Sequence, residues 1–527
     1  MTTPQPAADG WSHSGAAGRG AGRADPPSDL PAGLGDALAA AQIPFVTDQA
    51  VLAGHCVDWT GRWHGPALAS VRPRSTEEVA LVLVAARAAR VAVQVQGGNT
   101  GLVGGSVPDR PCLLLLTTGL DRLDPVDPGE RTAVVGAGVT AARLEAHART
   151  AGLHFGVDLA SRDSATVGGM AATNAGGIGV CAYGMMRAQL RGLVAVLADG
   201  RVVRSVGRPR KDNCGYDLTG LLAGSEGTLG VITEVEVALH PRPAASTVGL
   251  LAVPDLAAAV ELARRVQRGR SLLLAAEVVD AAAVARAADA LGSADPLRRE
   301  RPAQWLLLLE VADGGSAEGL ADVADHVVAV ATTPADRERL WAVREMQAEL
   351  HSRYPGLRKL DVSVRLADLD AAVAAIRSAV AGGPAEPAGR VLSHEAGQVL
   401  GERVAESATE PSGHRGPGDV PEGLPEVMFG AGPDADAPQI AFFGHLLDGN
   451  LHVQLVGASE ATERRAIEAV AAAGGSISAE HGIGRMKRDQ LHLARSAEQI
   501  DWMRAIKSTV DPQGLLNPGV LIDPLRT

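Results

Sequence analysis

Three glycine-rich segments lie in the first half of the chain, at residues 96–106, 164–177 and 224–233. The first, QGGNTGLVGGS, holds five glycines in nine residues and follows a short β-branched run. Glycines leave backbone N–H groups unshielded, so such a loop can wrap a diphosphate and donate several hydrogen bonds to it. One loop of this kind is explained equally well as a flexible turn, but three in one region favour a phosphate-bearing cofactor.

The second and third segments add hydroxyl groups to this pattern. In SATVGGMAATNAGG, at 164–177, the side chains of Ser164, Thr166 and Thr173 are interleaved with glycines. The third segment, GSEGTLGVIT, closes the same region of mixed strands and helices. Together the three segments predict one cofactor site rather than three separate turns.

A shorter glycine motif offers an alternative cofactor. Gly136 and Gly138 follow an expected strand and open an expected helix, in a G-x-G-x-x-A pattern with Asp158 about 20 residues later. This arrangement is typical of NAD-binding folds. However, Asp158 does not end a clear second strand, so a strand-to-helix turn within the larger domain is preferred.

Element patterns predict two main domains. Ser75 and Glu78 form a capping-box pattern ahead of a helix ending near Ala89, and an Asp199-Gly200 turn predicts a hairpin. We expect a disordered leader over 1–32, a cofactor domain over 33–243, a substrate domain over 244–460 and a helical segment over 461–527 that completes the active site. A Gly/Pro/Ala/Glu-rich surface insert, flexible in part, is expected over 382–438.

Composition excludes several classes of protein. A net charge of −12 without a basic run argues against a nucleic-acid-binding surface. The apolar runs are too short to span a bilayer, and the N-terminus has no signal core. We expect a cytoplasmic protein, with peripheral membrane association left open. The four cysteines fit no zinc module and are expected to be free thiols: Cys56, Cys112, Cys181 and Cys214.

Two histidines and a Glu-His pair form a second constellation. His445 and His452 lie seven residues apart, and the Asp448-Gly449 turn between them could direct both imidazoles to one side. Glu480 and His481 follow in a glycine-flanked loop. Two histidines and one carboxylate make an open divalent-metal site with positions left for substrate. A lone histidine is more typical of packing or of a surface position, and the Glu480-His481 pair is what favours a metal site.

The three glycine-rich segments resemble the FAD domain of the vanillyl-alcohol-oxidase/p-cresol-methylhydroxylase superfamily. The resemblance implies an α+β fold, with a two-subdomain p-cresol-methylhydroxylase-type FAD domain, an antiparallel α+β substrate (cap) domain and a small C-terminal helical part. Some relatives attach the flavin through a histidine where this chain has Asn99, so non-covalent FAD is expected. The implied cofactor-binding residues are Gly97, Gly98, Asn99, Thr100, Gly101, Ser164, Gly168, Gly169, Thr173, Asn174 and Ile232.

The histidine segments resemble the D-2-hydroxyglutarate dehydrogenase and D-lactate dehydrogenase branch of the FAD-linked oxidases. That branch carries G-H-x-G-D-G-N-x-H followed by S-x-E-H-G-x-G, and segments 211–217 and 509–519 resemble it too. The resemblance implies a divalent metal, zinc in the first instance, on His445, His452 and Glu480. It makes His481 the catalytic base.

The same resemblance implies a substrate site formed by Arg344, Lys359, Gln454 and His481. An arginine fork suits a carboxylate, although each charge alone is equally typical of a solvated surface. The implied reaction is metal-assisted oxidation of a D-2-hydroxy acid, of the D-2-hydroxyglutarate or D-lactate type, to the 2-keto acid by hydride transfer to flavin N5. An electron-transfer flavoprotein, a quinone, a cytochrome or oxygen would then accept the electrons. A homodimer stays open.

Four departures from the branch pattern leave other functions open. Leu447 replaces a glycine and could crowd the hairpin or its approach to substrate, and Ala348 replaces a hydroxyl residue. Gln454 stands where the hydroxyglutarate enzymes carry Asn, and Arg365 stands where proline is common. A catalytically altered or degenerate member with another substrate is therefore one alternative. A non-redox transferase on the same FAD fold, like the ether-lipid synthases, is a second alternative. Those synthases lack the paired-histidine signature that this chain carries.

Overall fold

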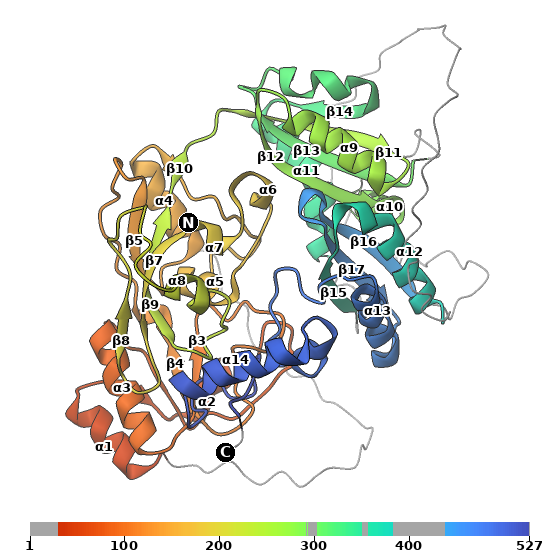
Figure 1. Cartoon of the computed structure of the whole chain (residues 1–527). Helices are drawn as coiled ribbons and strands as arrows, with labels where there is room; N and C mark the ends of the chain where they lie inside the picture. Colours follow the sequence, from red (N-terminus) through yellow and green to blue (C-terminus); the bar gives the residue numbers. More distant parts are fainter. Residues whose placement is uncertain (1–29, 291, 293–302, 350–356, 383–437, 526–527) are drawn as a thin grey trace, which may run out of the picture.

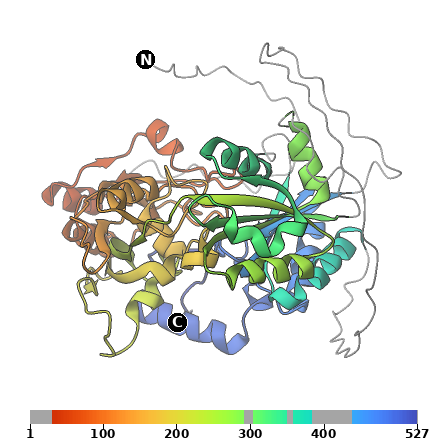
Figure 2. The same ribbon diagram turned by 90° about the horizontal axis from the view of Figure 1, so that it is seen from above.

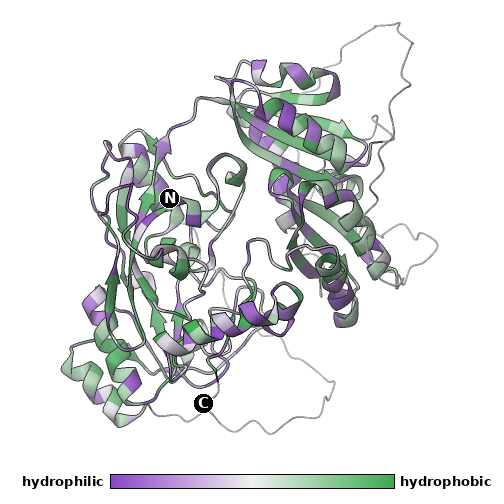
Figure 3. Ribbon diagram, viewed as in Figure 1, coloured by the Kyte–Doolittle hydropathy of each residue, from purple (hydrophilic) through white to green (hydrophobic). Residues whose placement is uncertain are grey.

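The computed structural model describes residues 30–290, 292, 303–349, 357–382 and 438–525. They form two domains side by side, and the C-terminal segment returns across both (Figures 1 and 2). The strands of both domains are mostly hydrophobic, while hydrophilic residues mark the outer helices (Figure 3). The predicted α+β class is confirmed. The expected leader, except for residues 30–32, and residues 383–437 of the expected insert lie outside the described residues.

The first domain begins with a four-stranded sheet in the order β1-β2-β4-β3, in which β4 is parallel to both of its neighbours. Ser75 caps helix α3 by accepting the Glu78 N–H at 3.2 Å. Glu78 instead accepts the Arg74 N–H, so only half of the predicted capping box forms. The elements are α1 (Ala32–Ala40), β1 (Phe45–Val46), α2 (Gln49–Ala53), β2 (Ala69–Val71), α3 (Thr76–Ala88), β3 (Val93–Gln96), β4 (Leu113–Leu116) and η1 (Thr117–Gly119).

A second four-stranded sheet, β5-β9-β7-β8, completes this domain and is antiparallel throughout. Gly136 ends β5, which pairs antiparallel with β9, whereas an NAD-binding βαβ unit needs parallel strands. The NAD alternative is therefore wrong. The elements are β5 (Thr132–Gly136), α4 (Ala141–Thr150), β6 (Leu153–His154), α5 (Val167–Thr173), α6 (Val180–Tyr183), α7 (Met186–Gln189), β7 (Leu190–Val196), β8 (Val202–Arg204), α8 (Leu218–Leu222), β9 (Val231–Ala238) and β10 (His240–Pro241).

The second domain is built on a seven-stranded antiparallel sheet in the order β14-β11-β13-β12-β16-β17-β15. Its interior strand β13 sends Leu307 and Leu309 into one buried cluster and Leu306 and Leu308 into another. Helices cover both faces, which explains the nearly continuous apolar run of that strand.

The helices of the second domain divide between the two sheet faces. Residues of α9, α12 and α13 pack on one face, and those of α10 and α11 pack on the other. The elements are β11 (Ser246–Val253), α9 (Leu256–Gln267), β12 (Leu272–Asp280), α10 (Ala281–Ala290), β13 (Trp305–Ala312), η2 (Glu318–His326), β14 (Val327–Ala331), α11 (Pro334–Glu349), β15 (Arg358–Ser363), η4 (Leu366–Asp368), α12 (Leu369–Val380), β16 (Gln439–His445), η5 (Leu446–Asp448), β17 (Asn450–Val456) and α13 (Glu460–Ala472).

The expected C-terminal segment 461–527 does not form a unit of its own. Helix α13 is part of the core of the second domain, whereas η6 (Arg488–Leu493) and α14 (Ala497–Val510) follow the loop that leads back to the first. The buried Lys507 donates to the backbone oxygens of Thr228 and Leu516, which fixes α14 there. The apolar pattern of segment 461–527 predicted its helices correctly. That pattern does not determine which domain each helix packs against.

Candidate active site

A cavity of about 870 Å³ lies where the three glycine-rich segments face the seven-stranded sheet. This volume is in the upper part of the range for ligand sites, ~300–1,000 Å³. Both sequence constellations meet there. The predicted residues that line it are Gly97, Gly98, Asn99, Thr100, Gly101, Ser164, Gly168, Gly169, Thr173, Ile232, Arg344, Lys359, His445, His452, Gln454, Glu480 and His481.

Asn174 is the one predicted cofactor residue that does not line the cavity. It ends helix α5 with a φ of 51°, a conformation that asparagine tolerates. Its side-chain oxygen accepts the Arg187 N–H at 2.8 Å. The structure therefore gives Asn174 a turn-forming role, which its position in a glycine-rich run concealed.

The first two glycine-rich segments pack backbone against backbone. A Cβ at Gly98 would lie 1.9 Å from the carbonyl oxygen of Ser164, and one at Gly97 would lie 2.5 Å from Thr166 Oγ1. Only glycine permits this approach. In contrast, a Cβ at Gly101 would meet no atom within 4 Å. The first two glycine-rich segments thus form a cradle that is closed where they pack together and open toward the cavity.

Asn99 holds the first segment in shape. Its side-chain amide donates to Val57 O at 2.9 Å, and its oxygen accepts from Ser106 Oγ at 2.7 Å. The φ of 54° at Asn99 turns the loop at this point. The side chain is therefore occupied in bracing the loop, while the loop's glycines face the cavity.

Three imidazoles converge on one carboxylate oxygen at the second-domain wall of the cavity. Oε1 of Glu480 lies 3.7 Å from His445 Nε2, 3.4 Å from His452 Nε2 and 3.9 Å from His481 Nε2. A tetrahedral ion with bonds of ~2.1 Å separates its ligand atoms by about 3.4 Å. The donors are close to the spacing that a metal ion requires, and the β16–β17 hairpin directs both of its histidines inward as predicted.

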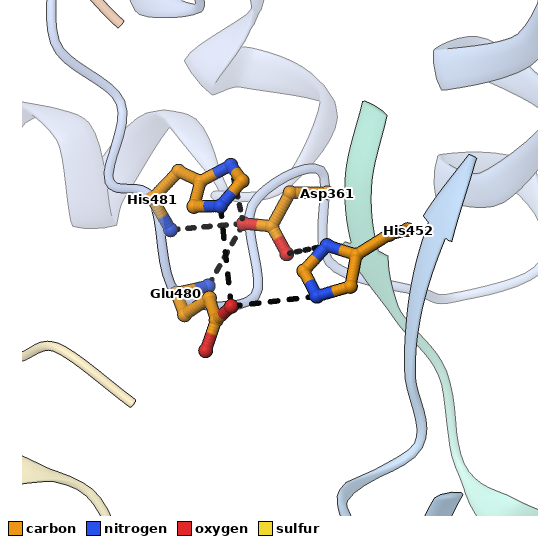
Figure 4. Close-up of side chains that lie close together, drawn as sticks. All are labelled: Asp361, His452, Glu480 and His481. Carbon is orange, nitrogen blue, oxygen red and sulfur yellow. Dashed lines mark hydrogen bonds and ion pairs between the residues drawn. The ribbon is translucent and has the colours of Figure 1, made fainter. Parts of the chain in front are cut away.

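Asp361 of β15 lies between His452 and His481 (Figure 4). One of its oxygens accepts the backbone N–H groups of Ala479, Glu480 and His481, at 3.1, 2.9 and 2.9 Å. The other accepts from Asn450 Nδ2 at 2.8 Å. Asp361, His452, Glu480 and His481 also lie close enough together to hold an ion. With both oxygens already hydrogen-bonded, Asp361 is better placed to orient the ligands than to bind the ion.

Glu277 of β12 supports the other side of the cluster. It is fully buried and lies opposite His445 in the sheet. Its two oxygens accept from His445 Nδ1 at 2.6 Å and from Arg344 Nε at 2.7 Å. One carboxylate thus fixes both a candidate metal-binding histidine and the candidate substrate-binding arginine.

Electrostatics favour ligation at this cluster. Burial lowers the pKa of His452 to about 3, so this imidazole is neutral and free to bind a metal. Burial opposes ionisation of Glu480, but the hydrogen bond and charge of His445 hold the pKa of that carboxyl below its usual value. Burial also acts against protonation of His445, but Glu277 and Glu480 together raise its pKa to about 10. Without an ion, a proton on His445 therefore balances these carboxylates.

Two cationic side chains line the cavity beside the cluster. The Arg344 guanidinium lies over the Phe443 ring, 4.7 Å from its centroid. Lys359 stands on β15 directly opposite Gln454 on β17, and burial lowers its pKa to about 8. In the part of the chain that the structure describes, the Lys359 ammonium has no ion pair or hydrogen bond. Gln454 donates to Gln347 O at 2.5 Å, which ties β17 to α11.

Sequence reasoning missed Glu277, Asp361 and Phe443. Each is a polar or aromatic residue within a strand of apolar neighbours. A lone carboxylate in such a strand is a recognisable signal, because burying a charge without a partner is costly. That signal points to a partner but cannot identify it.

Two departures from the family pattern leave the cavity intact. Leu447 packs against the core of the second domain and does not line the cavity, so the crowding considered for this position does not reach the cavity. Arg365 is exposed and pairs with Asp368 at 2.8 Å. The side chain of Ala348 lies outside the described residues.

Two family models match most of the chain. An FAD binding domain matches residues 67–205, and the C-terminal domain of FAD linked oxidases matches 242–388 and 431–521. A mitochondrial D-2-hydroxyglutarate dehydrogenase of Bos taurus is 32% identical over 90% of this chain and 80% of its own length. A D-2-hydroxyglutarate dehydrogenase of Xanthomonas citri pv. viticola is 32% identical over 90% and 94%. A D-lactate dehydrogenase of Archaeoglobus fulgidus is 34% identical over 86% and 91%.

Solved structures share the fold at lower identity. An alkyldihydroxyacetonephosphate synthase superposes with a TM-score of 0.66 at 17% identity, covering 94% of this chain and 86% of that chain. p-Cresol methylhydroxylase superposes with a TM-score of 0.64 at 15% identity, covering 93% and 96%. Among the described residues, no helix has both the length and the apolar character to cross a membrane.

Proposed function

The chain belongs to the FAD-linked oxidases, and on that premise we propose that it oxidises a D-2-hydroxy acid to the 2-keto acid. Relatives named for D-2-hydroxyglutarate and D-lactate match across nearly the whole chain. The cavity joins an FAD cradle to a cluster of histidines and carboxylates. Their juxtaposition is the observation that carries the proposal.

The first domain fits non-covalent FAD. At Gly101 an added Cβ would meet no atom within 4 Å, so the first segment is open toward the cavity, where its backbone N–H groups could bind a diphosphate. FAD, when bound, supplies the two-electron acceptor for the substrate's α-hydrogen. Gly97 to Gly101, Ser164, Gly168, Gly169, Thr173 and Ile232 would hold it.

The second domain fits a divalent metal. His445, His452 and Glu480 offer two imidazole nitrogens and one carboxylate oxygen, a donor set typical of catalytic zinc. Such an ion would lower the pKa of a substrate hydroxyl. Glu277 and Asp361 would orient the ligands from behind.

His481 is the general base in this proposal. It lies in the loop that Asp361 fixes through backbone hydrogen bonds, and its ring remains a quarter exposed toward the cavity. Its Nε2 faces the same carboxylate oxygen as the two candidate ligands. It is therefore placed to take the proton of the hydroxyl that is oxidised.

Arg344 and Lys359 favour a substrate with a second carboxylate. Glu277 already neutralises Arg344, whereas Lys359 pairs with no anion among the residues that the structure describes. An unpaired ammonium in a partly desolvated cavity is costly unless a ligand neutralises it. D-2-hydroxyglutarate is therefore favoured over D-lactate, with Gln454 beside the Lys359 contact. An electron-transfer flavoprotein, a quinone, a cytochrome or oxygen would take the electrons onward.

Turnover with separated enantiomers tests this proposal. Purified protein is assayed with an artificial electron acceptor and with the D- and L-forms of 2-hydroxyglutarate and lactate, and the 2-keto acid is quantified. We expect D-2-hydroxyglutarate to have the highest kcat/KM and the L-forms to be inactive. Equal turnover of D- and L-forms, or no turnover of any D-2-hydroxy acid, would contradict it.

A further inference from the structure

Glu226 connects the two halves of the active site. It belongs to the third glycine-rich segment of the first domain, lines the cavity and is 8% exposed. Its two carboxylate oxygens accept the backbone N–H groups of Ile483 and Gly484, both at 2.8 Å. Those residues lie two and three positions after His481 in the loop that also carries Glu480.

Two carboxylates from different domains thus hold successive N–H groups of one loop. Asp361 of the second domain binds those of residues 479, 480 and 481, and Glu226 of the first domain binds those of 483 and 484. The loop passes from Asp361 to Glu226 at Gly482, whose φ of 81° turns the backbone. A Cβ at Gly482 would lie 3.0 Å from the Glu226 carboxylate, so the loop approaches as closely as glycine allows.

Glu226 is a buried carboxyl group with two hydrogen-bond donors and one cation beside it. Burial raises its pKa, while the two N–H groups and the charge of Lys487 act in the opposite direction. Lys487 is itself buried and donates to Asp361 O at 3.4 Å, so its ammonium lies near both carboxylates. The backbone oxygen of Glu226 accepts from Asn517 Nδ2 at 2.7 Å, and Asn517 Oδ1 accepts the Val95 N–H ahead of the first glycine-rich segment.

We infer that Glu226 is a positioning residue that sets the distance between the hydroxy-acid site and the flavin cradle. This inference rests on the proposed function of the same site. Asp361 keeps His481 and Glu480 in register with the other second-domain ligands through hydrogen bonds from their backbone N–H groups. Glu226 is the side chain through which the first domain holds Ile483 and Gly484, and beyond them Arg485 and Met486 donate their N–H groups to Val103 O of the first glycine-rich segment. Its loss therefore changes the transfer distance without changing the groups that bind the metal or the substrate.

Glu226→Gln tests the inference, because the amide keeps the size of the side chain but can accept only one of the two N–H groups. Glu236→Gln is the matched control: Glu236 is 7% exposed in the same domain and accepts the Gly207 N–H at 2.7 Å, away from the cavity. The first readout is backbone amide hydrogen exchange of the holoenzyme, resolved by residue. We expect exchange at Ile483 and Gly484 to quicken about tenfold in Glu226→Gln, while 479–481 stay protected.

The second readout is anaerobic flavin reduction by D-2-hydroxyglutarate in a stopped-flow instrument. For Glu226→Gln we expect the limiting rate constant to fall about 10- to 100-fold, with the substrate Kd changed by less than about threefold. Glu236→Gln should alter neither quantity. Unchanged exchange at 483 and 484, an unchanged rate constant, or a parallel loss of rate and substrate affinity would overturn the inference. If no D-2-hydroxy acid reduces the wild-type flavin, the proposed function fails, and the exchange pattern still decides whether Glu226 holds the loop.

Discussion

Glu277 Oε1 lies 2.6 Å from His445 Nδ1, and both groups are buried. This contact fixes the tautomer of His445, so that Nε2 points at Glu480. The second oxygen of Glu277 holds Arg344. A single buried side chain therefore prepares both the candidate metal site and the candidate carboxylate site.

Glu277→Gln is expected to weaken metal binding about 10- to 100-fold, as is typical when a carboxylate behind a metal-binding histidine is lost. Metal affinity is measured by titrating metal-free protein with zinc. Glu310→Gln is the control: Glu310 accepts from Trp341 Nε1 of α11, the helix that carries Arg344, but touches no metal candidate. Equal zinc affinity in Glu277→Gln and wild type would contradict the assigned role.

Removal of the metal should impair substrate oxidation without releasing FAD. After dialysis against a chelator, we expect the protein to keep its flavin absorbance, because the FAD cradle lies in the first domain. Reduction by D-2-hydroxyglutarate should slow at least about tenfold and recover when zinc is returned. Unchanged reduction after the metal content has been shown to be zero would rule out metal assistance.

Substrate affinity should depend on the charge of Lys359. Burial lowers its pKa to about 8, so the ammonium is present at pH 7 and mostly lost at pH 9. Affinity for 2-oxoglutarate, measured by perturbation of the flavin spectrum, should fall up to about tenfold over this range. Lys359→Met should bind weakly at both pH values. A wild-type pH profile that matches the variant's would show that Lys359 does not contact the ligand.

The same group has a predictable effect on stability. Because the folded-state pKa of Lys359 lies below its unfolded value of 10.5, protonation favours the unfolded chain. This side chain therefore reduces the free energy of unfolding below pH 8, and that effect is lost as pH rises from about 8 to 10.5. Lys359→Met should be more stable than wild type at pH 7, as measured by denaturant unfolding, with the difference gone at pH 10.5.

Gly98→Ala tests the cofactor cradle. The added Cβ would lie 1.9 Å from Ser164 O, so the two glycine-rich segments would have to separate. We expect most of the bound flavin to be lost, as measured by the ratio of absorbance at the flavin band to that at 280 nm. Gly33→Ala is the control, because that helical position has no atom within 4 Å and alanine favours the helix. Full flavin content in Gly98→Ala would contradict the proposal that these two segments form the FAD site.

Local patterns in the sequence predicted much of this site. The Asp448-Gly449 turn lies between two histidines at a spacing that places both on one side of a hairpin, and the structure confirms that arrangement. Glycine density likewise identified the three segments that line the cavity. These predictions succeeded because turns and alternation depend on neighbouring residues.

The orienting residues could not be predicted in the same way. Glu277 is 168 residues from His445, and Asp361 is 120 residues from His481. Their roles depend on strand order in the seven-stranded sheet, where β12 lies beside β16 and β15 beside β17. The local capping-box motif was confirmed only in part. The Glu78 carboxylate accepts the Arg74 N–H instead of the Ser75 N–H that the motif predicts.

The anaerobic absorption spectrum tests the central claim most directly. We predict that the purified protein shows the visible absorption bands of oxidised flavin. Addition of D-2-hydroxyglutarate without oxygen should bleach the longer-wavelength band and release 2-oxoglutarate in equal amount. A flavin-containing protein that neither D-2-hydroxyglutarate nor D-lactate bleaches, or a protein that cannot be loaded with FAD, would contradict the account.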